Sequence, residues 1–419
     1  MVRCSTLARS ALAAVFIVSC LGTAAVVNAG KEDDNARKED RNAGKEDGYV
    51  ETDLVVNKSV NNVPTLTDKN GIVHIAKFFD PNLLNPWGVG ESATSPFWVS
   101  DNNAGKSTLY NTQGAPQSRV VSIPAPGDPL GASGAPTGVV FNTAFDQGAF
   151  KISGFDSTTG KAVTAPARFL FATEDGTIVG WNPNVNPEGF DPAKAGNYGI
   201  IAVDNSSTTH GANGAVYKGL AIATTDSGKT FLYATNFRGG RVESYDANFA
   251  AVASPPAFTD PKLPDSYAPF NIVPIIVNDE VELFVTFAVQ NSAKHDDVAG
   301  KGHGIVDTFD LEGEMRRRFA QHGQLNSPWG VALAPRNFGE LGGSVLIGNF
   351  GDGHINAFNP RDGEFLGKVR EPKGQAIVID GLWTVMFGNG GNGGATNTLY
   401  FTAGPNEEKD GLFGSLAPN

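Results

Sequence analysis

The feature that most constrains the fold is a unit of short strands and tight turns that recurs along the chain. Its clearest copy runs from Leu325 to Phe365 and reads as strand, turn, strand, Gly-rich turn, strand, polar turn and the start of a fourth strand. The apolar runs are rich in Val, Ile, Phe and Tyr and are bounded by Gly, Asn, Asp and Pro, which is typical of β-strands. A unit repeated at this length predicts a repeat architecture.

Six copies of the unit align on the residue that follows the opening pair of the first strand. These anchor positions are Gly88, Gly138, Gly219, Asn271, Gly330 and Thr384. The 81-residue interval between the second and third anchors contains two insertions, which we expect to be loops, around Ser153–Thr164 and Asn184–Asn213. Because a single unit cannot bury both faces of its sheet, the pattern predicts an all-β, six-bladed β-propeller.

The sixth unit ends at the C-terminus without a fourth strand. The apolar run Val73–Phe79 precedes the first unit, and we expect this N-terminal strand to close the last blade and remove an exposed sheet edge. The predicted organisation is therefore a signal peptide at 1–29, a disordered charged linker at 30–72 and the propeller at 73–419.

The N-terminus has the composition of a secretory leader. Arg3 and Arg9 precede an apolar core, and small residues end at Ala29, which predicts a signal peptide and a secreted, extracellular protein. The alternative is a bacterial lipid anchor at Cys20. The linker repeats an Asn-Ala-Gly-Lys-Glu-Asp motif of mixed charge, which cannot bury enough apolar surface to fold. Both cysteines, Cys4 and Cys20, lie in the leader, which excludes a disulfide framework in the mature chain.

The charge balance narrows the classes of partner. A formal net charge of −12 argues against binding to nucleic acid or anionic lipid, because both are negatively charged. Beyond the leader no apolar stretch is long enough to span a membrane. We expect a monomer without a membrane span, whose acidity serves either solubility or cation binding.

The repeat also carries a family resemblance. The rhythm of Leu83–Asn111, Ala167–Pro183, Tyr267–Phe309 and Leu325–Asn359 resembles NHL-type propeller repeats and an uncharacterised family of bacterial, fungal and plant proteins. The resemblance covers Phe78 to Leu416. It implies a propeller fold and assigns no reaction.

In a propeller, the turns between second and third strands and the turns leading into first strands lie on one face around the central channel, where loops commonly carry function. The polar and aromatic residues at these turns form the predicted binding face at the channel mouth. They are Trp87, Asp101, Asn102, Glu174, Asp175, Asn236, Arg238, Gln290, Asp297, Trp329, Asn349, Asp352 and Asn406.

Oxygen ligands at equivalent repeat positions suggest a metal site on the axis. Asp101, Glu174, Asn236 and Asn349 could together bind Ca²⁺ or Mg²⁺. The alternative is that these residues cap their own turns, as Asp and Asn commonly do.

The longest turn, from Gln290 to His303, contains the candidate catalytic pair. A carboxylate fixes the tautomer and basicity of an imidazole, so His295 and Asp296 could act as a general base. The alternative is a Gly-rich hairpin whose carboxylates pair with Lys294 and Lys301. Neighbours on an extended chain face opposite ways, so we expect only one of Asp296 and Asp297 to point inward.

Three tryptophans start the first strands of their units. Trp87, Trp329 and Trp383 could form an aromatic ring that stacks sugars or peptides at the channel mouth, or could wedge between blades.

Two classes of function remain open. One is a binding module that presents its channel mouth to an extracellular protein, glycan or small molecule. The other is a divalent-metal-dependent hydrolase of lactones or esters, because six-bladed propellers of the gluconolactonase and senescence-marker-protein type are similar. In that family Glu, Asn and Asp hold the metal. This chain offers Asn85, Asn271 and Asp380 at its first-strand starts and no Glu, so whether it is an enzyme stays open.

Overall fold

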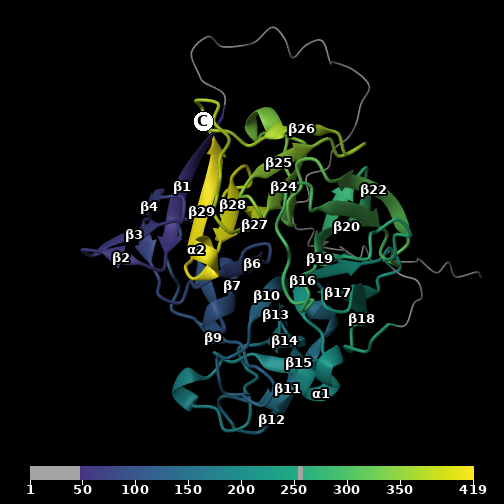
Figure 1. Ribbon diagram of the computed structural model, residues 1–419. Helices are drawn as coiled ribbons and strands as arrows, with labels where there is room; N and C mark the ends of the chain where they lie inside the picture. Colours follow the sequence, from purple (N-terminus) through teal and green to yellow (C-terminus); the bar gives the residue numbers. More distant parts are fainter. Residues whose placement is uncertain (1–47, 253–257) are drawn as a thin grey trace, which may run out of the picture.

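The computed structural model describes residues 48–252 and 258–419, so the predicted signal peptide and the first part of the predicted linker lie outside the described residues. The described chain is all-β, with short helices confined to its connections (Figure 1). None of the described helices has the length and apolar character needed to cross a lipid bilayer.

Six sheets of three to five strands make up the body of the described chain, and we number them in chain order. The first contains β6 (Pro86–Gly90), β7 (Phe97–Asp101), β8 (Lys106–Tyr110) and β9 (Val121–Ser122). The second contains β10 (Pro136–Phe141), β13 (Phe169–Thr173), β14 (Thr177–Trp181) and β15 (Ile200–Asp204). The third contains β16 (Tyr217–Thr224), β17 (Thr230–Asn236) and β18 (Arg241–Tyr245).

Neighbouring strands pair antiparallel in the remaining three sheets as well, except that β5 pairs parallel with β1 in the sixth. The fourth contains β19 (Tyr267–Val277), β20 (Glu280–Val289), β21 (Ile305–Phe309) and β22 (Met315–Gln321). The fifth contains β23 (Pro328–Leu333), β24 (Val345–Asn349), β25 (Ile355–Phe358) and β26 (Phe365–Lys368). The sixth contains β27 (Leu382–Phe387), β28 (Leu399–Ala403), β29 (Leu412–Pro418), β1 (Tyr49–Val56) and β5 (Phe78–Phe79).

Two small sheets and several short helical turns lie outside these six sheets. Two further sheets are formed by β2 (Ser59–Val60), β3 (Val63–Thr67) and β4 (Val73–Ile75), and by β11 (Lys151–Phe155) and β12 (Ala162–Pro166). The helical turns are α1 (Ser207–His210), α2 (Pro405–Glu408), η2 (Asn102–Ala104), η3 (Phe145–Gln147), η4 (Pro192–Lys194), η5 (Gly211–Asn213) and η6 (Gly339–Leu341).

The anchor residues explain how the six first strands pack. A Cβ on Gly138 would lie 2.4 Å from the backbone nitrogen of Leu220 in the next first strand, and one on Gly330 would lie 2.6 Å from the carbonyl oxygen of Trp383. Glycine is therefore required because the backbones approach too closely for any side chain.

At the two anchors that are not glycine, a hydrogen bond joins the neighbouring strands. The Asn271 side-chain amide donates to the carbonyl of Trp329 (2.8 Å), and the Thr384 hydroxyl donates to the carbonyl of Trp87 (2.7 Å). The second of these bonds joins the sixth sheet back to the first. The first strands thus contact one another in a cycle through β6, β10, β16, β19, β23 and β27.

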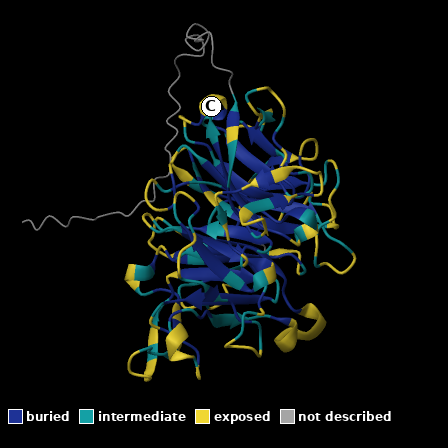
Figure 2. Ribbon diagram, turned by 90° about the vertical axis from the view of Figure 1, so that its left-hand side faces the viewer, coloured by how far each residue is buried: buried dark blue, intermediate teal, exposed yellow. Residues whose placement is uncertain are grey.

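Apolar cores lie between neighbouring sheets all the way around this cycle. Phe171 and Trp98 belong to the core between the first and second sheets, and Phe97 and Phe413 belong to the core between the sixth and the first. Figure 2 shows the buried strands in the body and the exposed residues mainly in the connecting loops. The all-β prediction is confirmed, and the stacking of sheets around a common centre is that of a β-propeller.

The strand that joins the C-terminal sheet differs from the predicted one. The prediction used Val73–Phe79, but β1, from Tyr49 to Val56, pairs antiparallel with β29, and only Phe78–Phe79 follows as the parallel strand β5. Part of the segment predicted as disordered linker therefore forms structure, and Val73–Ile75 is β4 of a separate small sheet. Figure 1 shows β1 in purple beside β29 in yellow.

The long interval between the second and third anchors also differs in detail. The insertion predicted as a loop around Ser153–Thr164 forms the hairpin of β11 and β12, with Ser153 opposite Thr164. The hairpin packs its apolar side chains, including Ile152, onto the core shared by the second and third sheets, which stabilises strands that the polar sequence does not favour alone.

Candidate functional site

Most of the residues just before the anchors gather where the six first strands meet, since four of them share one apolar cluster and Lys218 lies over the ring of Trp87. In chain order these residues are Trp87, Thr137, Lys218, Phe270, Trp329 and Trp383. Four are large aromatics, and Lys218 is the single charged member of the set. Its side chain is only 2% exposed.

Lys218 is the centre of a charged cluster at the channel mouth. Its ammonium contacts the Glu174 carboxylate and lies 3.5 Å from Asp296 Oδ1. It also lies 5.0 Å from the ring centroid of Trp87. Burial by itself would lower the pKa of Lys218, but the carboxylates of Glu174 and Asp296 outweigh it and raise the pKa. The ammonium therefore stays charged at neutral pH.

The candidate catalytic pair belongs to this cluster. His295 Nδ1 lies 2.7 Å from Asp296 Oδ1, and a hydrogen bond from His295, together with Lys218, holds the pKa of Asp296 at about 2. Ligand atoms of Glu174, His295 and Asp296 all lie within 4.8 Å of one another. The pair predicted from the sequence is thus in contact, and it faces a glutamate that the sequence placed on another turn.

The expectation that only one of Asp296 and Asp297 faces inward stays a prediction. Asp296 contacts Lys218 while its side chain is 60% exposed, and Asp297 is the less exposed of the two, with burial raising its pKa. A bridge between Gln290 and Asp297 and the irregular turn around them break the strict alternation of an extended strand.

Glu408 reaches the cluster from a strained turn. Asn406, Glu407 and Glu408 have φ values of 61°, 57° and 64°, a left-handed conformation that is costly for residues other than glycine. Asn85 donates a hydrogen bond to Glu408 Oε2 (2.7 Å). Burial, with the nearby charge of Glu174, raises the pKa of Glu408 to about 7. Strain of this kind is concentrated at functional sites, where the surrounding structure has to maintain it.

An aromatic plug lies next to the charged cluster. Trp87 stacks on Trp383 at 3.5 Å between ring centroids, Phe350 stacks on the other side at 4.0 Å, and Trp329 meets both tryptophans edge-on. All three tryptophans are at most 4% exposed. They therefore neither form an open stacking surface nor wedge between sheets, and they fill the centre of the ring.

On the other side of the plug, the first strands line an apolar cavity of about 450 Å³. Every one of the six sheets contributes to its wall, through residues such as Val89, Val139, Ile222, Ile272, Val331 and Val385. The centre of the molecule thus has a charged end and an apolar end separated by tryptophan.

The four predicted metal ligands behave differently from one another. Glu174 joins the Lys218 cluster, but Asp101 is fully buried in the first sheet, where burial raises its pKa well above the usual range. Asn236 donates to Glu243 (2.9 Å), and Asn349 donates to the carbonyl of Gln324 (2.7 Å). Among the hydrogen bonds and ion pairs of the described residues, none joins these four to one another.

The other predicted binding residues mostly fix the turns around the mouth. Asn102 donates to Glu174 Oε2 (2.9 Å), and Asp175 accepts from the backbone of Ala135 (2.8 Å). Arg238 donates to the Gly214 carbonyl (3.1 Å), and Gln290 donates to the Phe237 carbonyl (2.5 Å).

Two more of these residues cap turns. Asp352 accepts a hydrogen bond from Asn349, and Asn406 donates to Asp410 Oδ2 (2.7 Å).

Lys218 and Glu408 are the functional candidates that the sequence analysis missed. A signal for Lys218 was present, because Val-Tyr-Lys-Gly-Leu-Ala aligns Lys218 with the tryptophans that precede three of the other anchors. Glu408 had no such signal, since only the left-handed turn brings its side chain to the centre.

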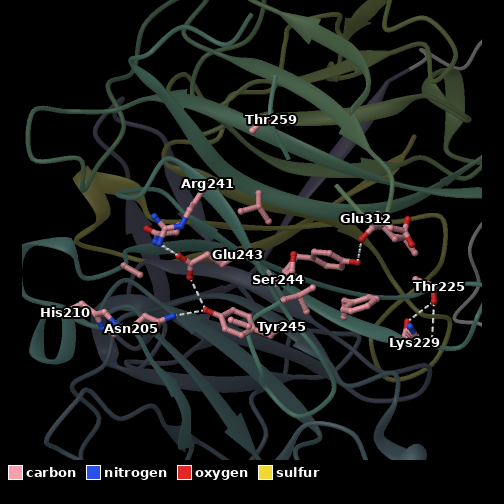
Figure 3. Close-up of a pocket in the computed structure, with 18 of the residues that line it drawn as sticks. Asn205, His210, Thr225, Lys229, Arg241, Glu243, Ser244, Tyr245, Thr259 and Glu312 are labelled. Atoms are coloured by element: carbon pink, nitrogen blue, oxygen red, sulfur yellow. Dashed lines mark hydrogen bonds and ion pairs between the residues drawn. The ribbon is translucent and has the colours of Figure 1, made fainter. Parts of the chain in front are cut away.

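A separate groove of about 880 Å³ runs along β18, which is an edge strand in the described third sheet. Figure 3 shows Glu243 in its wall between Arg241 and Tyr245. Asn205 donates to Tyr245 Oη (2.8 Å), and Tyr245 Oη donates to Glu243 Oε2 (3.0 Å). These side chains satisfy one another.

No established protein-family profile matches the chain. Relatives do occur in Acanthamoeba polyphaga mimivirus. "Uncharacterized protein L690" is 31% identical over 348 residues, covering 82% of this chain and 82% of the relative. "Uncharacterized protein R648" is 29% identical over 341 residues, covering 80% and 76%.

Solved structures with similar coordinates include two β-propeller-like enzymes. Streptogramin B lyase is 11% identical, with 89% of this chain and 98% of that chain covered and a TM-score of 0.46. The PQQ-bound aldose sugar dehydrogenase of Streptomyces coelicolor is 15% identical, with 80% and 95% covered and a TM-score of 0.43. Neither likeness bears on the activity of this chain. By its sequence identity over most of both chains, the protein belongs to the same family as the uncharacterized mimivirus protein L690.

Proposed function

We propose that the chain is a secreted six-bladed propeller that acts as an extracellular binding module through its channel mouth. The observation that carries this proposal is Lys218, a buried ammonium held between Glu174 and Asp296 at the centre of the ring. The cycle of first strands and the shared cavity wall support six blades. A fully desolvated charge with carboxylates arranged around it is costly unless it is well paired, and such a site is commonly functional.

The chemistry of the mouth favours a ligand that donates hydrogen bonds. Glu174, Asp296, Asp297 and Glu408 are acceptors when ionised, and Lys218 is a single cation among them. A partner with amine or hydroxyl groups complements this surface, whereas an anionic partner would be repelled. Among the proteins, glycans and small molecules expected from the sequence, we therefore favour a ligand that carries hydrogen-bond donors.

A binding screen with matched variants tests the proposal. The chain is presented to a glycan array and to a library of basic peptides, and D296N and E408Q are compared with D146N, which removes the same type of charge from an exposed turn on the second sheet. Binding that survives in D146N and falls in D296N and E408Q supports the channel mouth. Binding that is equal in all variants would place the site elsewhere and refute the proposal.

A divalent-metal-dependent hydrolase is the second candidate, because Glu174, His295 and Asp296 have the donor types and the proximity of a metal site. Lys218 weighs against it, since its ammonium already contacts the same carboxylates. A bound cation would have to displace that ammonium. Metal analysis before and after EDTA, with a lactone and ester hydrolysis screen on wild type and H295Q, decides between the two candidates. Stoichiometric metal and hydrolysis that both depend on His295 would favour the enzyme.

Secretion is part of the same proposal and has its own test. The N-terminal residue of the exported protein is expected to follow Ala29. Recovery of a lipid-modified N-terminus at Cys20 would instead show membrane anchoring.

A further inference from the structure

A second cluster of metal-ligating side chains lies at the seam where the N-terminal strand meets the body. Glu51 and Asp53 are two residues apart on β1, so both side chains lie on the same side of the strand. His74 lies on β4, which contacts β1 through the small appended sheet. One ligand atom from each of these three residues lies within 4.8 Å of the others.

The cluster combines a buried imidazole with carboxylates on both sides. His74 is 5% exposed, and its Nδ1 lies 3.2 Å from Asp53 Oδ1. Its other ring nitrogen, Nε2, lies 3.9 Å from Asp68 Oδ2, whose side chain is fully buried. Burial would lower the pKa of His74, but Asp53, Glu51 and Asp68 outweigh it and raise the pKa.

Negative charge is in excess at this seam. Burial and the charge of Asp53 raise the pKa of Glu51 to about 7, and Glu371 adds to the repulsion. Among the described residues, the buried Oε1 atom of Glu51 has no hydrogen-bond partner. An unpartnered buried carboxylate oxygen is costly, and a cation at this point would both ligate it and relieve the repulsion.

We propose that Glu51, Asp53 and His74 bind one divalent transition-metal ion, with Zn²⁺ as the best match. A donor set of one imidazole nitrogen and carboxylate oxygens is typical of Zn²⁺ and is atypical of Ca²⁺, which prefers oxygen ligands alone. Zinc–ligand distances of about 2.0–2.2 Å put the ligand atoms of a tetrahedral site roughly 3.3–3.6 Å apart. The three ligand atoms here lie within 4.8 Å of one another, so an inward movement of the side chains by about 1 Å completes the site. Asp68 Oδ2 lies 3.9 Å from His74 Nε2, on the side where a carboxylate commonly orients a ligating histidine, and a shift of about 1 Å would form that hydrogen bond.

Such an ion would fasten β4 to β1 and thereby hold the strand that completes the sixth sheet. Metal affinity is expected to rise with pH, because an imidazole or carboxylate must be deprotonated to ligate the ion.

The test uses the full chain with Zn²⁺ and with Co²⁺, whose visible absorption reports its ligands. The expected result is one equivalent of metal, an increase in thermal midpoint on Zn²⁺ addition that EDTA reverses, and roughly 100-fold weaker binding in E51Q and H74Q. The variant E174Q/H295Q, which disrupts the channel-mouth cluster, should bind as wild type. E51Q is included because it keeps the shape of the side chain and removes only the charge of a carboxylate whose Oε1 atom has no hydrogen-bond partner, so it is not expected to unfold the chain.

Three results would overturn the proposal. The first is the absence of Zn²⁺ binding by wild type in equilibrium dialysis at about 100 µM metal. The second is unchanged binding in both E51Q and H74Q, and the third is loss of binding in E174Q/H295Q alone. If H74Q lowers stability equally with and without Zn²⁺, His74 serves only as an ion-pair partner of Asp53.

Discussion

Replacing Lys218 by methionine is expected to expose the energetic role of the channel-mouth cluster. Methionine fills most of the volume of the lysine side chain but removes its charge, so Glu174 is left buried without its cation. Removing one partner of a buried ion pair costs about 3–5 kcal/mol of unfolding free energy, most of it from the charge that remains. The pair is well buried, with side-chain exposures of 2% and 13%, so solvent screening is weak.

A double-mutant cycle separates pairing from packing. E174Q alone leaves the ammonium near Asp296 and keeps an acceptor for Asn102, so its cost is expected to be smaller, about 2 kcal/mol. K218M/E174Q removes both charges, and its cost should be lower than the sum of the single costs by about 2 kcal/mol or more. Urea unfolding at pH 7, followed by tryptophan fluorescence, measures all four proteins.

Additive costs in this cycle would refute the reasoning, because they would show that Lys218 and Glu174 contribute independently. A K218M variant as stable as wild type would do the same.

Three further predictions follow from the fold. E408Q should match wild type in stability near pH 4 and exceed it by up to about 3 kcal/mol above pH 7. The folded-state pKa of Glu408 is raised from 4.5 to about 7, so the stability of wild type falls as pH rises between these values. Urea unfolding at pH 4.5 and at pH 8 measures the difference. G138A should lower stability by about 3 kcal/mol in urea unfolding, because its Cβ would meet the backbone of Leu220. The control G71A has free space around its Cβ and should cost about 1 kcal/mol for its positive φ alone. Equal losses in the two variants would contradict the packing argument. Deleting residues 1–57 should cause aggregation, because the deletion removes β1 and leaves β29 as an open sheet edge. Deleting residues 1–47 keeps β1 and should not cause aggregation. Size-exclusion chromatography distinguishes the two outcomes.

The sequence predicted the structure best where the local preference of a segment for strand or turn agrees with the packing of the six sheets. Short apolar runs between turn residues predicted the strands, and the anchors marked the point where the first strands touch. Glycine at Gly138 and Gly330 is dictated by backbone contact, which a single sequence reveals once the copies are aligned.

The errors have a common physical cause. Tyr49–Val56 contains Glu51 and Asp53 and follows a charged stretch, so its polar composition did not favour a strand, and only pairing with β29 makes it one. Lys218 was overlooked because a lysine in a strand usually faces solvent, and its burial depends on carboxylates that come from distant turns. Side-chain partners brought together by the ring cannot be inferred from spacing along one repeat.

The pairing of β1 with β29 has a consequence for how the protein is made. Tyr49 lies opposite Pro418, so the last sheet cannot be completed until almost the whole chain has been synthesised. Contacts between such distant segments slow folding, since the long loop must close before they form. During synthesis, before β29 has left the ribosome, the nascent protein would be an open arc with two unpaired edges, and this interval is when it is most vulnerable to self-association and protease. Chaperone dependence should therefore be concentrated in the time before β29 pairs with β1.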